Sequence, residues 1–274
     1  MDAPDLLATA GDRLSRVERA QIAFIKRSFE PGRLDRTIRW CQRTLGAGWI
    51  NGATGRLRRV HGLDRLPRFT PEQSFICVSN HRSFFDLYVV MAELIGRGLP
   101  QRIAFPVRSS FFYDNPLGFV VNGAMSFFAM YPPIFRDRKK LTLNVTSLEE
   151  AAWLLRRGGT FVGLHPEGTR KRDDDPYTFL PAQRGVGRLI HDARVPVIPV
   201  FVNGLGNDIV RQVRQNYDGT GTPIHVVFGA PIELDDLLEK KRSPKVDRAI
   251  SERTLEVIGK LGEEERQLRA AHGA

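Results

Sequence analysis

The sequence contains few residues of the kinds that cross-link a chain. Only two of its 274 residues are cysteine, and Cys41 and Cys77 lie in apolar contexts without a Cys-x-x-Cys pattern. This scarcity excludes a disulfide scaffold and indicates a reducing compartment. A secretory signal is also absent, because the acidic residues 1–5 are followed by no cleavable apolar core. We therefore expect a cytoplasmic protein.

Long apolar runs are scarce too. The longest candidate, residues 117–135, is broken by two glycines, Asn122 and the Pro132–Pro133 pair, whereas a membrane span needs about 20 predominantly apolar residues. We expect this stretch to form a buried helix and loop. Hydrophobic residues make up 42% of the chain, enough for one substantial α/β core rather than two equal domains.

Acidic residues are in deficit, mainly at the start of the chain. The formal net charge is +10, and residues 1–68 hold 14 Lys and Arg against 7 Asp and Glu, so +7 of the excess precedes the motifs described below. Apolar residues recur at helical spacing on both sides of a break at Pro31–Gly32, with arginines between them and Trp40 beside them. They are Leu14, Val17, Phe24 and Ile25 before the break, and Leu34, Ile38, Cys41 and Leu45 after it.

Helices with one apolar and one basic face suit the headgroup layer of an anionic membrane. The sequence therefore predicts that residues 1–55 associate with an anionic membrane surface, which would place the protein peripherally on a cytoplasmic membrane face. Packing of the same apolar faces on a protein core would give the same pattern. A basic chain can also bind nucleic acid, but this one has no nucleic-acid motif or stacking platform, so we expect no such partner.

Strand-like and helix-like segments alternate beyond residue 56. Strands are predicted near residues 57–63, 75–79, 102–107, 160–164, 196–202 and 223–228, and helices near 84–96, 116–129, 147–157 and 185–193. The alternation predicts an α/β fold with a central, largely parallel or mixed sheet flanked by helices and preceded by two amphipathic helices. The predicted division is a helical segment at 1–55, ending in a turn-rich linker at 46–55, and a domain at 56–274.

Two details of the helices are also predicted. Ser147 and Glu150 have the spacing of a capping box, which would begin the helix at residue 147. The segment 234–269 is charged and helical, and its Glu263-Glu264-Glu265 cluster indicates a solvated, frayed tail.

A histidine and an aspartate follow the predicted strand at 75–79. The chain there reads Asn-His-Arg-Ser-Phe-Phe-Asp, which places His81 five residues before Asp86. An imidazole can act as a base near pH 7, and a carboxylate on its second nitrogen fixes the tautomer and stabilises the imidazolium. With Ser83 as the N-cap of the next helix, Asp86 would project back toward His81. His81 and Asp86 are therefore the candidate catalytic residues.

A turn suited to anion binding follows the predicted strand at 160–164. Residues 165–170 read His-Pro-Glu-Gly-Thr-Arg. Pro166 sets a turn, Gly168 lets the backbone approach a ligand, and Arg170 can hold phosphate oxygens in bidentate fashion. Glu167 would repel a phosphate, so we expect it to accept a hydrogen bond from a substrate hydroxyl or to hold Arg170 in place.

Together with two further segments, these motifs form an ordered set. Residues 135–140 read Phe-Arg-Asp-Arg-Lys-Lys, and residues 195–200 read Val-Pro-Val-Ile-Pro-Val. The set resembles the glycerolipid acyltransferases of the 1-acylglycerol-3-phosphate acyltransferase type, whose blocks read Asn-His-x-x-x-x-Asp, Phe-x-x-Arg, Pro-Glu-Gly-Thr-Arg and Val-Pro-x-x-Pro-Val. The resemblance covers roughly residues 75–230, and the first and third blocks are the most specific.

This resemblance implies an O-acyltransferase that moves a fatty acyl group from acyl-CoA or acyl carrier protein to the free hydroxyl of a lysophosphatidate-like lipid. His81 and Asp86 would form a general-base dyad without a covalent intermediate, with Ser79 and Ser83 as the alternative nucleophiles. The thioester is a co-substrate, and neither a cofactor nor a metal is implied. The residues expected to bind the acceptor are Glu167, Gly168, Thr169 and Arg170, with Arg138 from the second block or Arg136, which is offset by two.

Several alternatives fit the same blocks. The acceptor could be glycerol 3-phosphate, another lysophospholipid or an amino-acid lysolipid, and a catalytically silent lipid-binding protein is disfavoured only by the presence of both dyad residues. The basic segment at 136–140 could be a solvated loop. Two departures from the family pattern, His165 where Phe is common and Lys171 where Ser is common, bear on the acceptor more than on the reaction.

Overall fold

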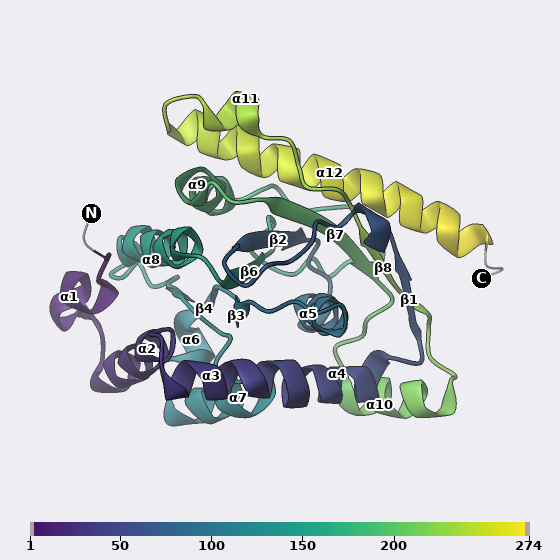
Figure 1. Ribbon diagram of the computed structural model, residues 1–274, viewed down its shortest axis with the longest axis horizontal. Helices are drawn as coiled ribbons and strands as arrows, with labels where there is room; N and C mark the ends of the chain where they lie inside the picture. Colours follow the sequence, from purple (N-terminus) through teal and green to yellow (C-terminus); the bar gives the residue numbers. More distant parts are fainter. Residues whose placement is uncertain (1–2, 272–274) are drawn as a thin grey trace.

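The structure, a computed structural model, describes residues 3–271. At its centre is a six-stranded sheet with the order β1-β8-β7-β2-β6-β3 (Figure 1). Neighbouring strands pair in parallel except β7 and β8, which are antiparallel. The predicted fold class, a largely parallel sheet flanked by helices, is confirmed. The six strands are β1 (Arg58–His61), β2 (Phe75–Ser79), β3 (Arg102–Ala104), β6 (Thr160–Leu164), β7 (Val197–Asn203) and β8 (Ile224–Phe228).

The predicted strand at 102–107 divides between two sheets. Residues 102–104 form the edge strand β3, and β4 (Val107–Arg108) pairs in parallel with β5 (Pro133–Ile134) in a separate two-stranded sheet. The split follows Phe105, whose amide donates to the Ala129 carbonyl, so the chain leaves the main sheet there. Periodicity alone could not reveal this exchange of partners.

Helices cover both faces of the sheet (Figure 1). On one side lie α8 (Leu143–Arg157), α9 (Arg184–Ala193), α11 (Asp235–Leu238) and α12 (Pro244–Ala271), and α12 packs on α9 and β7. On the other lie α3 (Arg33–Cys41), α4 (Ala47–Thr54), α5 (Asp86–Gly96), α6 (Ser109–Phe112), α7 (Pro116–Ser126) and α10 (Ile209–Asp218). Within the described residues, no helix has the length and hydropathy needed to cross a bilayer.

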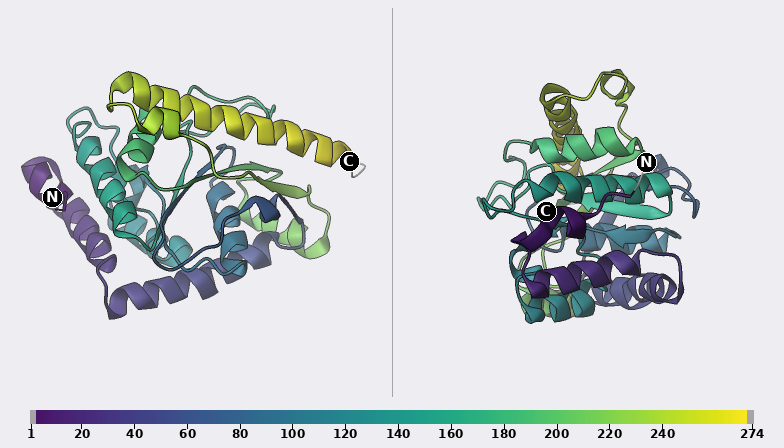
Figure 2. Two further views of the ribbon diagram at one scale, coloured as in Figure 1. Left: turned by 45° about the horizontal axis from the view of Figure 1, so that its top comes forward. Right: turned by 90° about the vertical axis from the view of Figure 1, so that its left-hand side faces the viewer.

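The N-terminal helices bury part of their apolar faces in the common core. They begin with α1 (Leu6–Ala10) and α2 (Arg16–Ser28), where Ser15 and Glu18 form a capping box, and α2 leads into α3 beneath the sheet (Figure 2). Ile22 and Ile25 are fully buried, and Ile38 is 5% exposed. Leu14, Ile25 and Ile38 therefore pack on protein, as in the alternative raised above, whereas Leu34 and Leu45 are 36% and 50% exposed. The division of the chain at residue 56 stays a prediction.

The linker predicted at residues 46–55 is wrong. Gln42–Gly46 forms a π-helical turn, and α4 follows it directly, so α3 and α4 make one nearly continuous rod. Ile50 is 1% exposed and Ala53 2% exposed, because α4 packs against α5 and α10. The glycines in this stretch indicated turns, but burial of Ala47, Ile50 and Ala53, which lie three residues apart on one face, stabilises the helix in spite of them.

Two predicted helix details are also wrong. Helix α8 begins at Leu143, so Ser147 lies inside it, and the Glu150 carboxylate accepts from Lys26 Nζ at 2.7 Å and from Leu6 N at 2.8 Å. Helix α12 continues to Ala271, and Glu265 within the predicted frayed tail is completely buried. Both glutamates have partners far away in sequence, which local spacing cannot indicate. Residues 272–274 of that tail lie outside the described residues.

Candidate active site

The predicted site residues converge at the carboxyl ends of two adjacent strands. His81 follows β2 by two residues, and His165 follows β6 directly. Because β2 and β6 pair in parallel, with Val78 opposite Leu164, their carboxyl ends meet at one edge of the sheet. In open parallel sheets this edge is the usual position of a ligand site. The structure thus brings the first and third motifs together.

The imidazole of His81 faces the carboxylate of Asp86. His81 Nδ1 lies 3.4 Å from Asp86 Oδ2, and the His81 side chain is 18% exposed whereas that of Asp86 is 1% exposed. If Nδ1 carries the proton and donates it to Asp86, Nε2 is left as the free acceptor. This tautomer is the one that a general base requires.

Asp86 is held by the backbone of the turn that precedes it. Its Oδ2 atom accepts from the amides of Arg82 and Ser83, each at 2.8 Å. Helix α5 therefore begins at Asp86, with Phe85 as its N-cap, and the predicted N-cap role of Ser83 is wrong. These two hydrogen bonds to the turn before the helix fix the aspartate beside His81.

The two serines near the dyad are fully buried and hydrogen-bonded. Ser79 Oγ lies 3.3 Å from Asn80 Oδ1, and Ser83 Oγ donates to the Gly206 carbonyl at 2.8 Å while accepting from Phe85 N at 3.2 Å. Neither hydroxyl is placed as a free nucleophile.

His165 stacks directly on His81. The two ring centroids are 3.7 Å apart and the rings are inclined by only 8°. His165 Nδ1 lies 3.0 Å from the Ser79 carbonyl, which can only accept, so this nitrogen carries the proton. The residue that departs from the family pattern thus supports one face of the candidate base.

Burial dominates the acid–base properties of this cluster. Together with the positive charge of Arg170, it lowers the pKa of His81 to about 3. Burial likewise lowers the pKa of His165 to about 3 and raises the pKa of Asp86 to about 6. Both imidazoles are therefore neutral at pH 7, and His81 can accept a proton. Any anion that neutralises Arg170 makes His81 more basic.

Glu167 contacts the backbone rather than Arg170. It is 1% exposed; Oε1 accepts from His81 N at 2.9 Å and Oε2 accepts from Leu180 N at 2.8 Å. Burial raises its pKa, while these two amides lower it. The carboxylate thus joins the turn that carries His81 to the loop after β6, an arrangement that the sequence did not indicate. Its role toward an acceptor hydroxyl stays a prediction.

Arg170 lines a cavity beside the dyad. The cavity has a volume of about 590 Å³ and is bordered by Asp86, Arg170 and Arg82 together with the loop between β7 and α10. Arg170 Nη1 donates to Asn207 Oδ1 at 2.8 Å, and this partner is neutral. Arg82 and Lys171 instead share Asp173, each at 2.7 Å. Arg170 is therefore the better placed of these cations to bind an anion.

The second motif reaches the site through Arg136. Arg136 Nη2 donates to the Gly168 carbonyl at 3.0 Å, so this arginine lies on the Pro-Glu-Gly-Thr-Arg turn. Arg138 and Thr169 are exposed. Gly168 has φ +67°, and a Cβ there would come within 2.7 Å of the Gln183 side chain, so only glycine fits easily. The sequence favoured Arg138, whereas the structure brings Arg136 to the turn.

One group in the described part of the chain could hold a metal ion. His81, Asp86 and His165 each offer one ligand atom, and these atoms lie within 4.8 Å of one another. The group coincides with the candidate dyad. In the reaction implied by the dyad, His81 takes up the proton and the Asp86 carboxylate accepts a hydrogen bond from Nδ1, so we assign no metal to the group.

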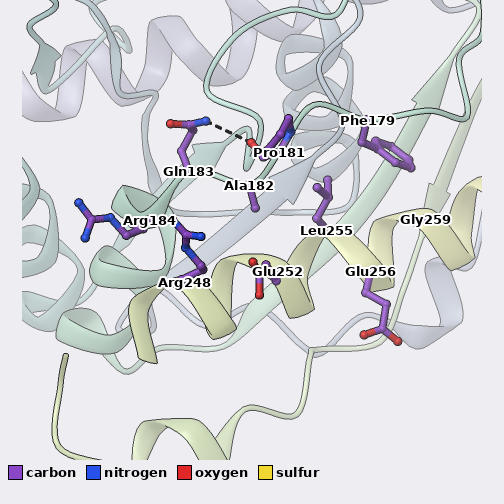
Figure 3. Close-up of a pocket in the computed structure, with 10 residues that line it drawn as sticks. All are labelled: Phe179, Pro181, Ala182, Gln183, Arg184, Arg248, Glu252, Leu255, Glu256 and Gly259. Atoms are coloured by element: carbon purple, nitrogen blue, oxygen red, sulfur yellow. Dashed lines mark hydrogen bonds between the residues drawn. The ribbon is translucent and has the colours of Figure 1, made fainter. Parts of the chain in front are cut away.

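A second cavity, of about 650 Å³, lies between residues 179–184 and α12 (Figure 3). Its apolar lining includes Phe179 and Leu255, and Arg248 and Glu252 on α12 bring charges of both signs. It contains none of the predicted site residues.

Sequence reasoning missed Asn207. Its Oδ1 atom accepts both from Arg170 and from Phe84 N, the latter at 3.1 Å, so it ties the loop after β7 to both motifs. The residue follows Gly204 and Gly206, and a glycine-rich turn after a strand is the signal that could have indicated it.

Comparisons with known proteins bear on these observations. The family model described as Acyltransferase matches residues 57–203. Human 1-acyl-sn-glycerol-3-phosphate acyltransferase alpha is 28% identical over 151 residues, 55% of this chain and 48% of that protein. The 1-acyl-sn-glycerol-3-phosphate acyltransferase of Saccharomyces cerevisiae is 25% identical over 132 residues, 48% of this chain and 39% of that protein. The chain spans about half the length of the curated relatives it matches.

A solved structure shares the fold. The 1-acyl-sn-glycerophosphate acyltransferase PlsC from Thermotoga maritima aligns over 88% of both chains with a TM-score of 0.54 and 20% sequence identity. Similarity at this level of identity concerns the architecture, not the substrates.

Proposed function

Because the chain belongs to the acyltransferase family, we propose that it is an O-acyltransferase that moves a fatty acyl group from a thioester donor to the free hydroxyl of a lysophosphatidate-like lipid. The observation that carries this proposal is the His81–Asp86 pair beside a cavity bordered by Arg170. Base, orienting carboxylate and anion-binding cation occur together at one sheet edge, as this reaction requires.

In the proposed mechanism, His81 Nε2 takes the proton from the acceptor hydroxyl as the oxygen attacks the thioester carbonyl. A carbon–oxygen bond forms, and Asp86 stabilises the imidazolium through Nδ1. The tetrahedral intermediate then collapses, the carbon–sulfur bond breaks, and the imidazolium returns its proton to the leaving thiolate. No enzyme nucleophile takes part, which agrees with the engaged hydroxyls of Ser79 and Ser83.

The acceptor's phosphate would lie against Arg170, with Arg136 and the Gly168–Thr169 turn at its edge. Guanidinium groups bind phosphate strongly through paired N–H donors. Binding would also neutralise the charge that lowers the pKa of His81. The base would therefore become stronger only when the acceptor is present, which couples binding to catalysis. The donor would be acyl-CoA or acyl carrier protein.

Membrane association would involve only some of the residues first expected, together with residues of α7. Leu14, Ile25 and Ile38 are buried, but Trp40 is 57% exposed and Leu45 is 50% exposed on the α3 side, and Leu117 and Val120 of α7 are 63% and 60% exposed. Exposed arginines, among them Arg36 and Arg43, accompany them. We place an anionic membrane surface against these residues, on a cytoplasmic face.

A product assay tests the proposed function. Purified protein is incubated with labelled acyl-CoA or acyl carrier protein and a panel of lysophosphatidate, glycerol 3-phosphate, other lysophospholipids and amino-acid lysolipids, and the products are measured by mass. We expect the acyl group on a phosphate-bearing lysolipid. Acylation only of a head group without phosphate would contradict the acceptor assignment, and transfer to none of them would contradict the function.

A further inference from the structure

Helix α10 exposes an apolar stripe to solvent. Val210 is 76% exposed, Val213 43% and Tyr217 84%. Their spacing of three and four residues places all three on one side of the helix. Such a stripe on a surface helix normally faces the core, where its burial is favourable.

The opposite side of α10 is polar and buried. Gln212 and Asn216 are each 6% exposed. Asn216 Oδ1 accepts from Arg56 N at 2.9 Å and from Leu57 N at 3.2 Å, and its amide donates to the Gly52 carbonyl at 2.7 Å. Hydrogen bonds therefore fix the helix on α4. The inward side of the helix is thus polar apart from Ile209, which packs against the core, while a separate apolar stripe faces outward.

From this exposed stripe we propose that α10 is a second membrane-contacting element, which lays Val210, Val213 and Tyr217 into the headgroup layer of an anionic bilayer. Exposed arginines border the stripe at positions 56, 211 and 214. Basic residues beside an apolar and aromatic stripe complement an anionic lipid surface, because their long stems extend to the phosphates while the apolar groups insert.

The position of α10 continues the surface already assigned to lipid. Helix α10 packs on α4, and α3, α4, α7 and α10 lie along the same edge of the molecule in Figure 1. Helices α3 and α7 lie in the first half of the chain, whereas α10 lies in the second half, after the catalytic motifs. Two elements distant in sequence would then hold the protein at the bilayer in one orientation.

This contact also bears on the active site. The loop before α10 contains Gly206, whose carbonyl accepts from Ser83 Oγ at 2.8 Å, and Asn207, which binds Arg170. That loop borders the cavity beside the dyad. A helix anchored in the headgroup layer therefore brings the opening of the acceptor site close to its lipid substrate. The inference rests on the proposed function in naming lipid as the partner.

A single environment-sensitive label tests the contact. In a Cys41→Ser background the remaining Cys77 is fully buried, so a nitrobenzoxadiazole label can be attached at Val213→Cys on α10, Leu45→Cys on the α3 side or Lys260→Cys on α12. Each labelled protein is mixed with vesicles of phosphatidylglycerol and phosphatidylcholine. We expect a blue shift, and quenching by spin-labelled lipid, at 213 and 45 but not at 260.

The outcomes separate this inference from the wider proposal. A response at 45 without one at 213 would overturn the role of α10 and leave the other membrane surface intact. No response at either position would overturn both membrane assignments, while the acylation assay would still decide the enzymatic function. A shift at 213 that needs no lipid and grows with protein concentration would show contact between two copies of the chain, and would also overturn the inference.

Substitution gives a second measurement. Replacing Val210, Val213 and Tyr217 with serine should weaken vesicle binding about tenfold or more, because three apolar side chains no longer insert. A control with Glu256→Ser and Lys260→Ser, an exposed pair on α12, should bind as the wild type does. Activity on a short-chain, fully dispersed acceptor should be unchanged in the triple variant. Equal vesicle binding by triple variant and wild type would contradict the proposal.

Discussion

Replacement of Glu167 by glutamine separates two roles for this buried carboxylate. Each of its oxygens accepts one backbone amide, from His81 at 2.9 Å and from Leu180 at 2.8 Å. Glutamine has one oxygen and one NH2 group, so one of the two amides would face a donor. A buried amide left without an acceptor costs about 1–3 kcal/mol. Part of that cost would appear as displacement of the turn that positions His81.

The expected kinetic effect follows from this displacement. If this displacement raises the activation free energy by about 1.4 to 2.7 kcal/mol, Glu167→Gln should lower kcat by about 10-fold to 100-fold. The KM for the lysolipid should stay within about twofold, because Arg170, the guanidinium proposed to bind its phosphate, does not hydrogen-bond to Glu167. Initial rates of thiol release, measured at varied acceptor concentration, give both constants.

A matched control is available on α8. Glu149→Gln removes the charge of a carboxylate that is 41% exposed and pairs with Arg188, so its kinetics should match the wild type. A Glu167→Gln variant with unchanged kcat and a strongly raised acceptor KM would refute the reasoning. It would show instead that Glu167 binds the acceptor, as the sequence alone indicated.

Three further predictions concern charge, pH and the N-terminal helices. Arg170→Gln should move the acid limb of the pH profile of kcat/KM to higher pH, because the Arg170 charge lowers the pKa of both His81 and Asp86; an unmoved limb would contradict this. The folded-state pKa of His165 lies near 3, below its ordinary value of 6.5, so the unfolded chain takes up protons first and stability falls as pH decreases from about 6.5. His165→Phe removes this titrating group, so between pH 7 and pH 5 the variant should lose about 2 kcal/mol less of its free energy of unfolding than the wild type, as measured by urea unfolding. An identical loss in the variant and the wild type would count against this. Deletion of residues 1–55 should prevent cooperative thermal unfolding, because it exposes the surface that Ile22 and Ile50 cover; a sharp transition in the truncated chain would show that the remainder folds alone.

The sequence predicted what depends on local pattern. Strands β2 and β6 were placed correctly because each is a short apolar run followed by a turn. The dyad could be expected because its two members lie five residues apart on one turn. The family resemblance was confirmed by the matching family model.

The sequence failed where partners are distant along the chain. The sequence assigned Glu150 to a capping box, whereas its carboxylate binds Lys26 and Leu6. Both partners precede Glu150 by more than 100 residues, so local spacing could not indicate them. Of the two arginines that the second motif offered, the sequence could not indicate which one would donate to the Gly168 carbonyl; in the structure it is Arg136. The sequence could not indicate the exposed stripe on α10, because a helical period of apolar residues predicts an apolar face but does not show whether the rest of the protein covers that face.

The most direct test of the account is the turnover of His81→Ala. Mass measurement of the acylated lysolipid, together with direct binding of the acyl donor, should show turnover reduced by about two to four orders of magnitude with donor affinity nearly unchanged. A loss of only a few-fold, in a variant that is folded and binds the donor, would contradict the claim that this imidazole removes the proton from the acceptor.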